Sequence, residues 1–209
     1  MKKLIKNILS WLKTPSIFIN HSAPIYPSIQ KDGVKIHIGS GEINLQGWIN
    51  IDARKFAHTH IKTDSLLLNQ FNDSSVNYIY MCHILEHLSF DEVEDLLSKL
   101  ITKLSKNGRL MISVPNFASI AAIYEKTNFN LDKIKYALMG GQDYEYNFHK
   151  SVYDKQNLIL ILEKAGFTSV TSWDSKEEFG KHIGDWSHYN EKVNGEKIPL
   201  SLNLKGLKK

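Results

Sequence analysis

The chain has 209 residues, of which 42% are hydrophobic and 23% charged, a composition typical of one globular domain or one domain with a small appendage. A chain of this length buries enough surface to need no disulfide or structural metal, and its single cysteine, Cys82, excludes an intrachain disulfide. The one cysteine is consistent with a reducing, cytoplasmic compartment. The net charge of +4 comes from the termini, since residues 1–35 carry +5, 36–180 carry −4 and 181–209 carry +3. Nucleic acid is therefore not the expected partner, because nucleic-acid enzymes more often carry a basic stripe across the working face.

Residues 1–33 are expected to lie outside the main domain. Apolar residues recur at helical spacing over 1–13 with lysines mostly off that stripe, which predicts a basic amphipathic helix. Prolines and Gly33 predict an irregular arm over 14–33. The first segment is too short and too polar to span a membrane and lacks an A-x-A-like cleavage site, so we expect no signal peptide. Two interpretations of residues 1–13 stay open: docking on the domain or a second subunit, or peripheral contact with an anionic membrane surface at the inner face.

From residue 34 onward, predicted strands alternate with predicted helices. Strands are expected over 34–38, 47–52, a segment ending near 64, 76–82, 109–114, 167–173 and 199–207, and helices over 117–138, although poorly patterned, and over 158–165. The best-marked helix begins with a capping box, Ser89-Phe90-Asp91-Glu92, and is expected to stop at Asn107-Gly108. The alternation with short links predicts an α/β domain over 34–209, with a mostly parallel sheet covered by helices on both faces.

Glycine and acidic residues follow the predicted strands where ligands bind in such sheets, at the carboxyl ends. Gly39-Ser40-Gly41 follows the first strand, and Asp52 follows the second. A glycine turn lets a ligand approach the backbone closely, and an acid after the second strand accepts ribose hydroxyls, so the pair predicts a nucleoside-containing cofactor. The dinucleotide fingerprint G-x-G-x-x-G lacks its third glycine, because Asn44 occupies that place.

Three segments together resemble the class I S-adenosylmethionine-dependent methyltransferase superfamily: Ile36-His37-Ile38-Gly39-Ser40-Gly41, Gly47-Trp48-Ile49-Asn50-Ile51-Asp52 and His83-Ile84-Leu85-Glu86-His87-Leu88. Within the superfamily, the sequence is similar to a bacterial subgroup of small methyltransferases often linked to surface-glycan synthesis. The resemblance implies a Rossmann-like, seven-stranded, mostly parallel sheet whose last strand is antiparallel. It also implies that S-adenosylmethionine lies against Gly39, Ser40 and Gly41 with its methionine portion, against Asp52 with its ribose, and near Asp64 and Ser65 with its adenine, while His83 lies near the transferred methyl group. The short gap from Gly41 to Asp52 departs from the pattern and leaves room for a first helix of a turn or two at most.

Two histidines are candidates for deprotonating a hydroxyl acceptor. His83 follows the fourth strand and His149 precedes a predicted helix, and a histidine with a pKa near neutrality suits a general base. For each, a capping or surface role is the alternative. Asp143, Tyr144 and Tyr146 share the loop of His149 and are candidates for lining an acceptor site. The histidines and the resemblance favour methyl transfer to a hydroxyl of a sugar or glycan precursor, with the oligomeric state left open.

The segment His83-Ile84-Leu85-Glu86-His87 also matches H-x-x-E-H, a zinc-peptidase signature. That motif belongs on a long helix with a further acidic ligand, whereas here it directly follows a strand and a new helix starts one residue later. We therefore expect no metal. Two alternatives remain: a non-catalytic S-adenosylmethionine-binding protein, and an NAD(P)-dependent sugar oxidoreductase. The missing third glycine and the lack of a Tyr-x-x-x-Lys pair in a helix after the fourth or fifth strand disfavour the oxidoreductase.

Overall fold

The computed structural model describes residues 26–27 and 33–209. The amphipathic helix predicted for 1–13, and nearly all of the arm predicted for 14–33, lie outside these residues. Within the described ranges, no helix is long and apolar enough to cross a membrane.

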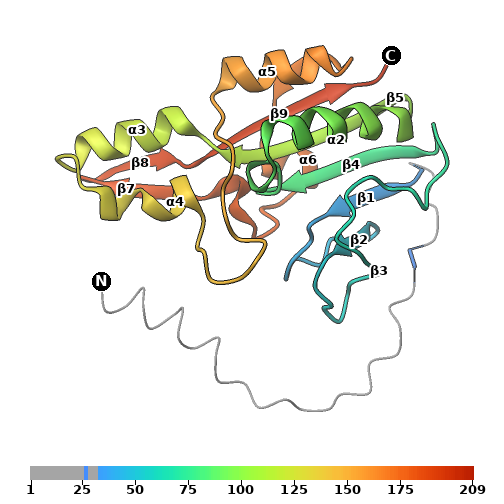
Figure 1. The fold of residues 1–209 in the computed structure, drawn as a ribbon, viewed down its shortest axis with the longest axis horizontal. Coiled ribbons are helices and arrows are strands. Elements are labelled where there is room, and N and C mark those ends of the chain that lie inside the picture. Colours follow the sequence, from blue (N-terminus) through green and yellow to red (C-terminus); the bar gives the residue numbers. More distant parts are fainter. Residues whose placement is uncertain (1–25, 28–32) are drawn as a thin grey trace.

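Seven strands form one sheet in the order β3-β2-β1-β4-β5-β9-β6 (Figure 1). Their bounds are Lys35–Ile38 (β1), Ile49–Asp52 (β2), Ile61–Lys62 (β3), Val76–Cys82 (β4), Leu104–Pro115 (β5), Thr168–Ser172 (β6) and Ser201–Leu207 (β9). Neighbours from β3 to β5 pair in parallel, whereas β9 is antiparallel to both β5 and β6. This sheet confirms the predicted Rossmann-like fold with its last strand antiparallel.

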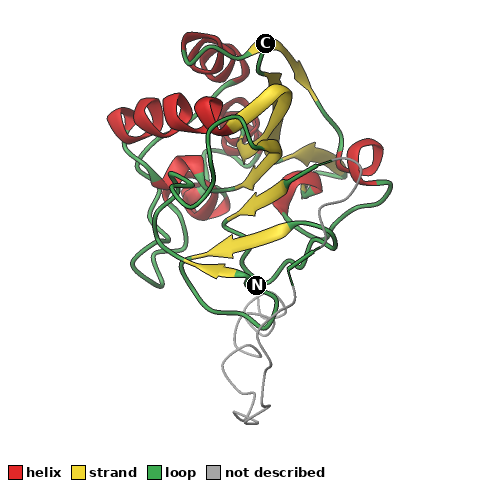
Figure 2. Cartoon of the chain, turned by 90° about the vertical axis from the view of Figure 1, so that its right-hand side faces the viewer, coloured by secondary structure: helices red, strands yellow, loops and turns green. Residues whose placement is uncertain are grey.

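Side chains that alternate along the central strands build a separate core on each face of the sheet. In β4, Ile79 and Met81 belong to one core and Tyr80 to the other. The helices α2 (Phe90–Lys103) and α5 (Lys155–Lys164) cover the first face. Figure 2 shows helices on both sides of the sheet. The second face is covered by the short helix α6 (Ser175–Phe179) and by an aromatic cluster. That cluster contains Trp48, Tyr80, Trp173 and Phe179.

Helix α2 begins as predicted. The Ser89 hydroxyl accepts a hydrogen bond from the Glu92 amide, and the Glu92 carboxylate accepts one from the Ser89 amide, which completes the capping box. The helix then buries its apolar stripe against the sheet through Val93, Leu96, Leu97 and Leu100.

The end of α2 differs from the prediction. The helix ends at Lys103 and not at Asn107-Gly108, because Leu104 is fully buried and already pairs with Val76 as the first residue of β5. Asn107, with φ of 62°, makes a turn inside that long strand, where its amide donates to the carbonyl of Lys208. The burial of Leu104 in the sheet therefore overrides the local stop signal.

The segment between β1 and β2 contains no helix. Residues 39–48 form turns, so even the short first helix allowed by the sequence is absent from this described segment. The turn after β1 therefore leads into β2 without an intervening helix, and Trp48, just before β2, packs into the aromatic face of the sheet.

Residues 117–138, expected to be helical, form three short elements: α3 (Phe117–Lys126), the 3-10 helix η2 (Leu131–Lys133) and α4 (Lys135–Met139). The helix breaks where Asn128 and Phe129 adopt left-handed backbone, with φ of 59° and 58°.

Against α3 lies a two-stranded hairpin that the sequence analysis missed, made of β7 (Asn190–Val193) and β8 (Glu196–Pro199). Its turn is Asn194-Gly195, a strong hairpin signal. Because Pro199 closes β8, the strand expected from Pro199 begins at Ser201.

The capping box yields a stability prediction. Replacing Ser89 by Ala removes the side-chain acceptor of the Glu92 amide, so we expect Ser89→Ala to lower the free energy of unfolding by about 0.5–2 kcal/mol in urea denaturation. Ser98→Ala is the matched control, because Ser98 is an exposed residue of the same helix whose hydroxyl bonds only to the Asp95 carbonyl. An equal loss in the two variants would contradict a role of the cap.

Candidate active site

The carboxyl ends of β1, β2 and β4 lie next to one another because these strands are parallel neighbours. Gly39–Gly41 follow β1, Asp52 ends β2, and His83 follows β4. Because β3 pairs in parallel with β2, Asp64 and Ser65 reach the same edge. The sheet thus gathers the predicted strand-end residues at one edge of the domain.

Asp52 holds the turn that follows β1. The Gly41 amide donates to Asp52 Oδ2 at 2.7 Å, and the Arg54 amide donates to Asp52 Oδ1 at 2.8 Å. Asp52 is nearly buried, with 8% of its surface exposed. Because each carboxylate oxygen accepts more than one hydrogen bond, Asp52 can hold the turn and still accept from the hydroxyls of a ligand.

Both glycines of the turn adopt left-handed backbone, with φ of 66° for Gly39 and 51° for Gly41. The space beside each of them explains in a different way why the position has no side chain. A Cβ on Gly39 would lie 2.0 Å from Ile84 Cδ1, so this glycine permits close packing. A Cβ on Gly41 would meet only Arg54 Nη2, at 3.8 Å, so the space beside Gly41 is open. Between them, Ser40 Oγ is buried and has no hydrogen-bond partner among the described residues. An open glycine turn beside an unpaired hydroxyl fits a polar ligand group.

Arg54 and His58 are further residues on this side of the edge, and the sequence analysis missed both. The Arg54 guanidinium lies over the rings of Phe56 and Tyr144, 5.0 and 4.7 Å from their centroids. His58 Nε2 donates to the Gly41 carbonyl at 3.0 Å. Tyr144, considered above for the acceptor side, therefore lies on the Asp52 side. No sequence signal links it to Arg54, because the contact joins segments far apart in the chain.

Asp64 and Ser65 are exposed at the end of β3. The Ser65 amide donates to Thr63 Oγ1 at 3.0 Å, which shapes the turn. The pKa of Tyr146 is raised by the charge of Glu145, and further by burial and by the charge of Asp64, which places the Tyr146 ring near this end of the site.

His83 is held in a strained and well-defined position after β4. Its φ of 54° is unusual for a residue with a side chain and costs about 1–3 kcal/mol. Its Nε2 lies 2.9 Å from Ser201 Oγ, and the Ser201 hydroxyl donates its one proton to the Trp186 carbonyl at 2.7 Å. His83 Nε2 must therefore be the donor to Ser201. The neutral ring then directs the lone pair of Nδ1 at Glu86 Oε1, 3.3 Å away.

Glu86, in the 3-10 helix η1 (Leu85–His87), is a buried carboxyl group without a hydrogen-bond donor. It is 1% exposed, and neither of its oxygens has a hydrogen-bond partner among the described residues. Besides His83, His149 Nε2 lies 3.9 Å from Glu86 Oε1. Burial raises the pKa of Glu86 to about 8, so without a cation beside it the carboxyl group keeps its proton at neutral pH.

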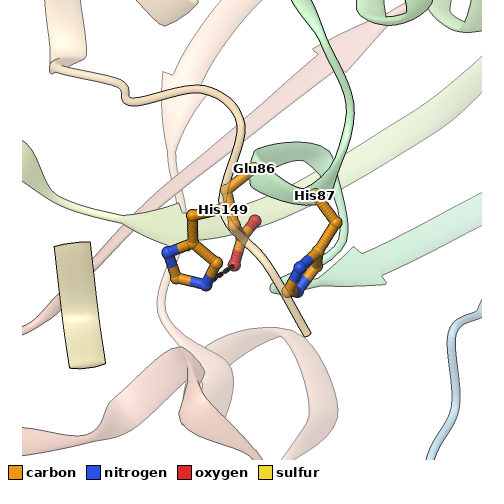
Figure 3. Close-up of side chains that lie close together, drawn as sticks. All are labelled: Glu86, His87 and His149. Atoms are coloured by element: carbon orange, nitrogen blue, oxygen red, sulfur yellow. Dashed lines mark ion pairs between the residues drawn. The ribbon is translucent and has the colours of Figure 1, made fainter. Parts of the chain in front are cut away.

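The backbone of Glu86 brings His149 to this place. The amides of Lys150 and Ser151 both donate to the Glu86 carbonyl, at 2.7 and 3.2 Å, and the His149 amide donates to the Met139 carbonyl at 3.1 Å. The segment before α5 is thereby fastened to η1, although the two are far apart in sequence. As Figure 3 shows, His149 and His87 then lie on either side of the Glu86 carboxyl group.

All three histidines around Glu86 are neutral at neutral pH. Burial lowers the pKa of His83 to about 3 and that of His149 to about 4, and it lowers the pKa of His87 as well. From the sequence, His83 and His149 were expected to have pKa values near neutrality. The structure corrects this, because desolvation disfavours the charged ring. Neutral rings present lone pairs, but with such pKa values they are weak proton acceptors.

Trp186, at the start of the 3-10 helix η3 (Trp186–His188), is a further residue that the sequence analysis missed. Its indole is 54% exposed, and its ring centroid lies 6.1 Å from that of His83. Asp185 positions η3, because its carboxylate accepts from the Ser187 amide at 3.0 Å and from the Tyr80 hydroxyl. An Asp before a short turn is a recognisable cap, but nothing in the sequence places it beside β4.

A cavity of about 460 Å³ lies away from these strand ends, on the aromatic face of the sheet. Trp48, Arg109 and Glu178 are among its lining residues, and the Arg109–Glu178 ion pair of 2.9 Å forms part of its wall. None of the site residues predicted from the sequence lines this cavity. The strand-end site is therefore separate from it.

Comparison with known proteins identifies the family to which the chain belongs. A family model described as a methyltransferase domain matches residues 20–172. Among similar solved structures, a SAM-dependent methyltransferase from Thermotoga maritima has 17% identity and a TM-score of 0.54, over 87% of this chain and 84% of that chain. One from Archaeoglobus fulgidus has 16% identity and a TM-score of 0.53, over 100% and 95% of the two chains. One from Methanosarcina mazei has 15% identity and a TM-score of 0.52, over 88% and 98%. No curated protein matches the chain significantly by sequence.

At these identities the solved structures show a shared fold, while the family match spans well over half of the chain. The open glycine turn, Asp52 and the seven-stranded sheet agree with that match. The chain belongs to the methyltransferase domain family and is an enzyme whose cofactor is S-adenosylmethionine.

Proposed function

We propose that the chain transfers the methyl group of S-adenosylmethionine to a hydroxyl oxygen of a sugar or glycan precursor. The observation that carries this proposal is the group formed by Glu86, His83 and His149, which lies next to the cofactor-side residues and beside the exposed indole of Trp186. A polar group at the methyl-transfer end is expected where an acceptor must lose a proton.

On the cofactor side, Gly39–Gly41 would hold the methionine portion and Asp52 the ribose hydroxyls. Asp64 and Ser65 would lie near the adenine. Support comes from the open space beside Gly41 and from the position of Asp52 across the same turn. When bound, the cofactor supplies a methyl group already activated by its sulfonium charge.

On the acceptor side, the protein must align the acceptor oxygen with the methyl group and assist the loss of its proton. Alignment alone supplies a large part of the rate enhancement in such displacements. We place the oxygen between His83 and His149, whose neutral rings point toward Glu86. His83 would thus lie near both the methyl group and the acceptor.

Two observations favour a hydroxyl group on a ring-shaped acceptor. Enzymes that methylate exocyclic amines of bases carry Asn/Asp-Pro-Pro-aromatic after the fourth strand, where this chain has Met81-Cys82-His83. The exposed indole of Trp186, against which Tyr189 packs edge to face with centroids 4.9 Å apart, offers a flat face to a sugar ring beside His83.

The ribose role of Asp52 predicts a defined loss of affinity. Asp52→Ala should weaken the binding of S-adenosylhomocysteine by about 1.5–3 kcal/mol, about 10- to 150-fold, as measured by calorimetry, because charge-assisted hydrogen bonds are lost. Asp91→Ala, at an exposed position in the first turn of α2, should bind normally. Unchanged affinity in a folded Asp52 variant would remove Asp52 from the site.

The acceptor role of His149 predicts a split between binding and turnover. His149→Ala should lower turnover by about 10²-fold, the low end of the range for a group that assists proton removal because its lowered pKa makes it a weak base, while affinity for S-adenosylhomocysteine stays unchanged. His182→Ala is the control, because His182 is exposed and lies outside the strand-end site. If both variants turn over like the native enzyme, His149 takes no part in the reaction.

The acceptor class is tested with S-adenosylmethionine carrying a labelled methyl group. We expect label to pass to hydroxyl-bearing sugars, sugar nucleotides or lipid-linked glycans, and the product to be a methyl ether stable to mild base. Label transferred to amines alone, under the same conditions, would contradict the hydroxyl assignment. Mass spectrometry with fragmentation locates the added methyl group.

A further inference from the structure

We propose that Glu86, His87 and His149 bind one divalent transition-metal ion, and that this ion binds the acceptor oxygen. The metal site itself follows from the geometry alone. The role of the ion in catalysis rests on the proposed methyl transfer to a hydroxyl group.

The three side chains converge closely enough to share one ion. Each offers one ligand atom, and these atoms all lie within 4.8 Å of one another (Figure 3). Because zinc binds nitrogen and oxygen ligands at about 2.0–2.2 Å in tetrahedral geometry, ligand atoms on one ion are about 3.4 Å apart. Side-chain rotations that move the ligand atoms together by about 1 Å would close the site.

The Glu86 carboxyl group supplies the independent sign of a ligand. Both of its oxygens are buried and lack a hydrogen-bond partner among the described residues, and the group is 1% exposed. Buried carboxylates are normally hydrogen-bonded, ion-paired or bound to a metal. In the described part of the chain, Glu86 forms no ion pair with a Lys or Arg. The charged-type side chains within ion-pair distance of it are the histidines His83 and His149.

The histidines are oriented as metal ligands usually are. A ligating imidazole typically donates its second ring nitrogen to a carbonyl group, which fixes the tautomer. His87 Nδ1 donates to the Phe148 carbonyl at 3.2 Å, so in the neutral ring the lone pair is on Nε2. The His149 ring lies against the backbone of Ala137 and Leu138, while its Nε2 faces Glu86.

The ligand set indicates the kind of metal. Two imidazole nitrogens and one carboxylate oxygen suit Zn²⁺, Fe²⁺, Co²⁺ or Mn²⁺, whereas Ca²⁺ and Mg²⁺ prefer oxygen ligands alone. Three protein ligands leave coordination positions open for an outside oxygen atom. The Nδ1 lone pair of His83, 3.3 Å from Glu86 Oε1, lies at the edge of the same site.

This ligand set differs from the peptidase site that the sequence analysis set aside. The H-x-x-E-H segment is not on a long helix, and only Glu86 and His87 of it combine with His149, which comes from another part of the chain. The expectation of no metal requirement was drawn from the helix context of that motif. The structure leads us to propose the opposite.

An ion at this place would acidify an acceptor hydroxyl bound to its open coordination position. Bound Zn²⁺ lowers the pKa of a water molecule from 15.7 to about 7, and a bound hydroxyl group is acidified in the same way. The hydroxyl proton leaves to solvent, and an oxygen lone pair forms the bond to the methyl carbon. The carbon–sulfur bond breaks with its electrons moving to sulfur, which gives a methyl ether and S-adenosylhomocysteine.

The test uses Co²⁺ as the probe on the full chain after removal of metal with a chelator. We expect one equivalent of Co²⁺ to bind with visible ligand-field absorption, and Zn²⁺ to displace it. Glu86→Gln, which keeps the size of the side chain, and His149→Ala should each weaken Co²⁺ binding by more than about 100-fold. Circular dichroism checks that each variant is folded, and His87→Ala replaces any variant that is not.

His182→Ala is the control, because His182 is an exposed histidine outside the proposed site that stacks on His188, with ring centroids 4.6 Å apart. Co²⁺ binding that is absent, or that survives Glu86→Gln and His149→Ala but is lost in His182→Ala, would overturn the proposed site. If Co²⁺ binds as expected but the chelated enzyme methylates its acceptor at full rate, the catalytic role of the ion is wrong. If metal binds and no hydroxyl acceptor is ever methylated, the proposed function fails and the metal site stands.

Discussion

The proposed acceptor side of this methyltransferase depends on the hydrogen bonds that fasten residues 149–153 to the 3-10 helix η1. The Glu86 carbonyl accepts hydrogen bonds from the amides of Lys150 and Ser151. The Leu85 carbonyl accepts hydrogen bonds from the hydroxyls of Ser151 and Tyr153. These carbonyls are buried, so leaving them unpaired would be costly, and the segment before α5 satisfies them. The same contacts carry His149 to the Glu86 carboxyl group. The hydrogen bonds that pair these buried backbone carbonyls thus also bring together side chains from two distant parts of the chain.

The two sides of the site are built differently. On the cofactor side, short-range contacts dominate: Asp52 binds the amides of Gly41 and Arg54, and its carboxylate is well satisfied. On the acceptor side, His83 adopts a strained backbone conformation and Glu86 is buried without a donor. Strain and unpaired buried groups persist where the surrounding structure enforces them, and they concentrate at functional sites. This contrast is why we assign binding to one side and chemistry to the other.

The sequence predicted what local pattern determines. The seven-stranded sheet, the capping box at Ser89 and the strand-end positions of Gly39–Gly41 and Asp52 follow from short motifs and alternation, and the structure has them. The end of α2 was wrong because burial of Leu104 in β5 outweighs a local stop signal. The Asn194-Gly195 turn was present in the sequence but was not recognised as a hairpin.

The acceptor side could not be predicted in the same way. His149 and Glu86 were each visible, but their proximity depends on contacts between segments separated by α2, β5, α3 and α4. Likewise, Tyr144 lies over Arg54, and Trp186 lies beside His83, only because of the tertiary fold. The pKa values of His83 and His149 are lowered by burial, which a sequence does not reveal. Both rings are therefore uncharged at neutral pH, although the sequence predicted pKa values close to 7.

The most direct test of the central claim is a crystal structure of the full chain with S-adenosylhomocysteine. We expect the ribose hydroxyls on Asp52, the homocysteine portion along Gly39–Gly41, and the sulfur atom directed toward His83 and the space beside Trp186. Binding of the ligand in the cavity lined by Trp48 and Arg109, or a sulfur atom directed away from His83 and Glu86, would contradict the division of the site into a cofactor side and an acceptor side.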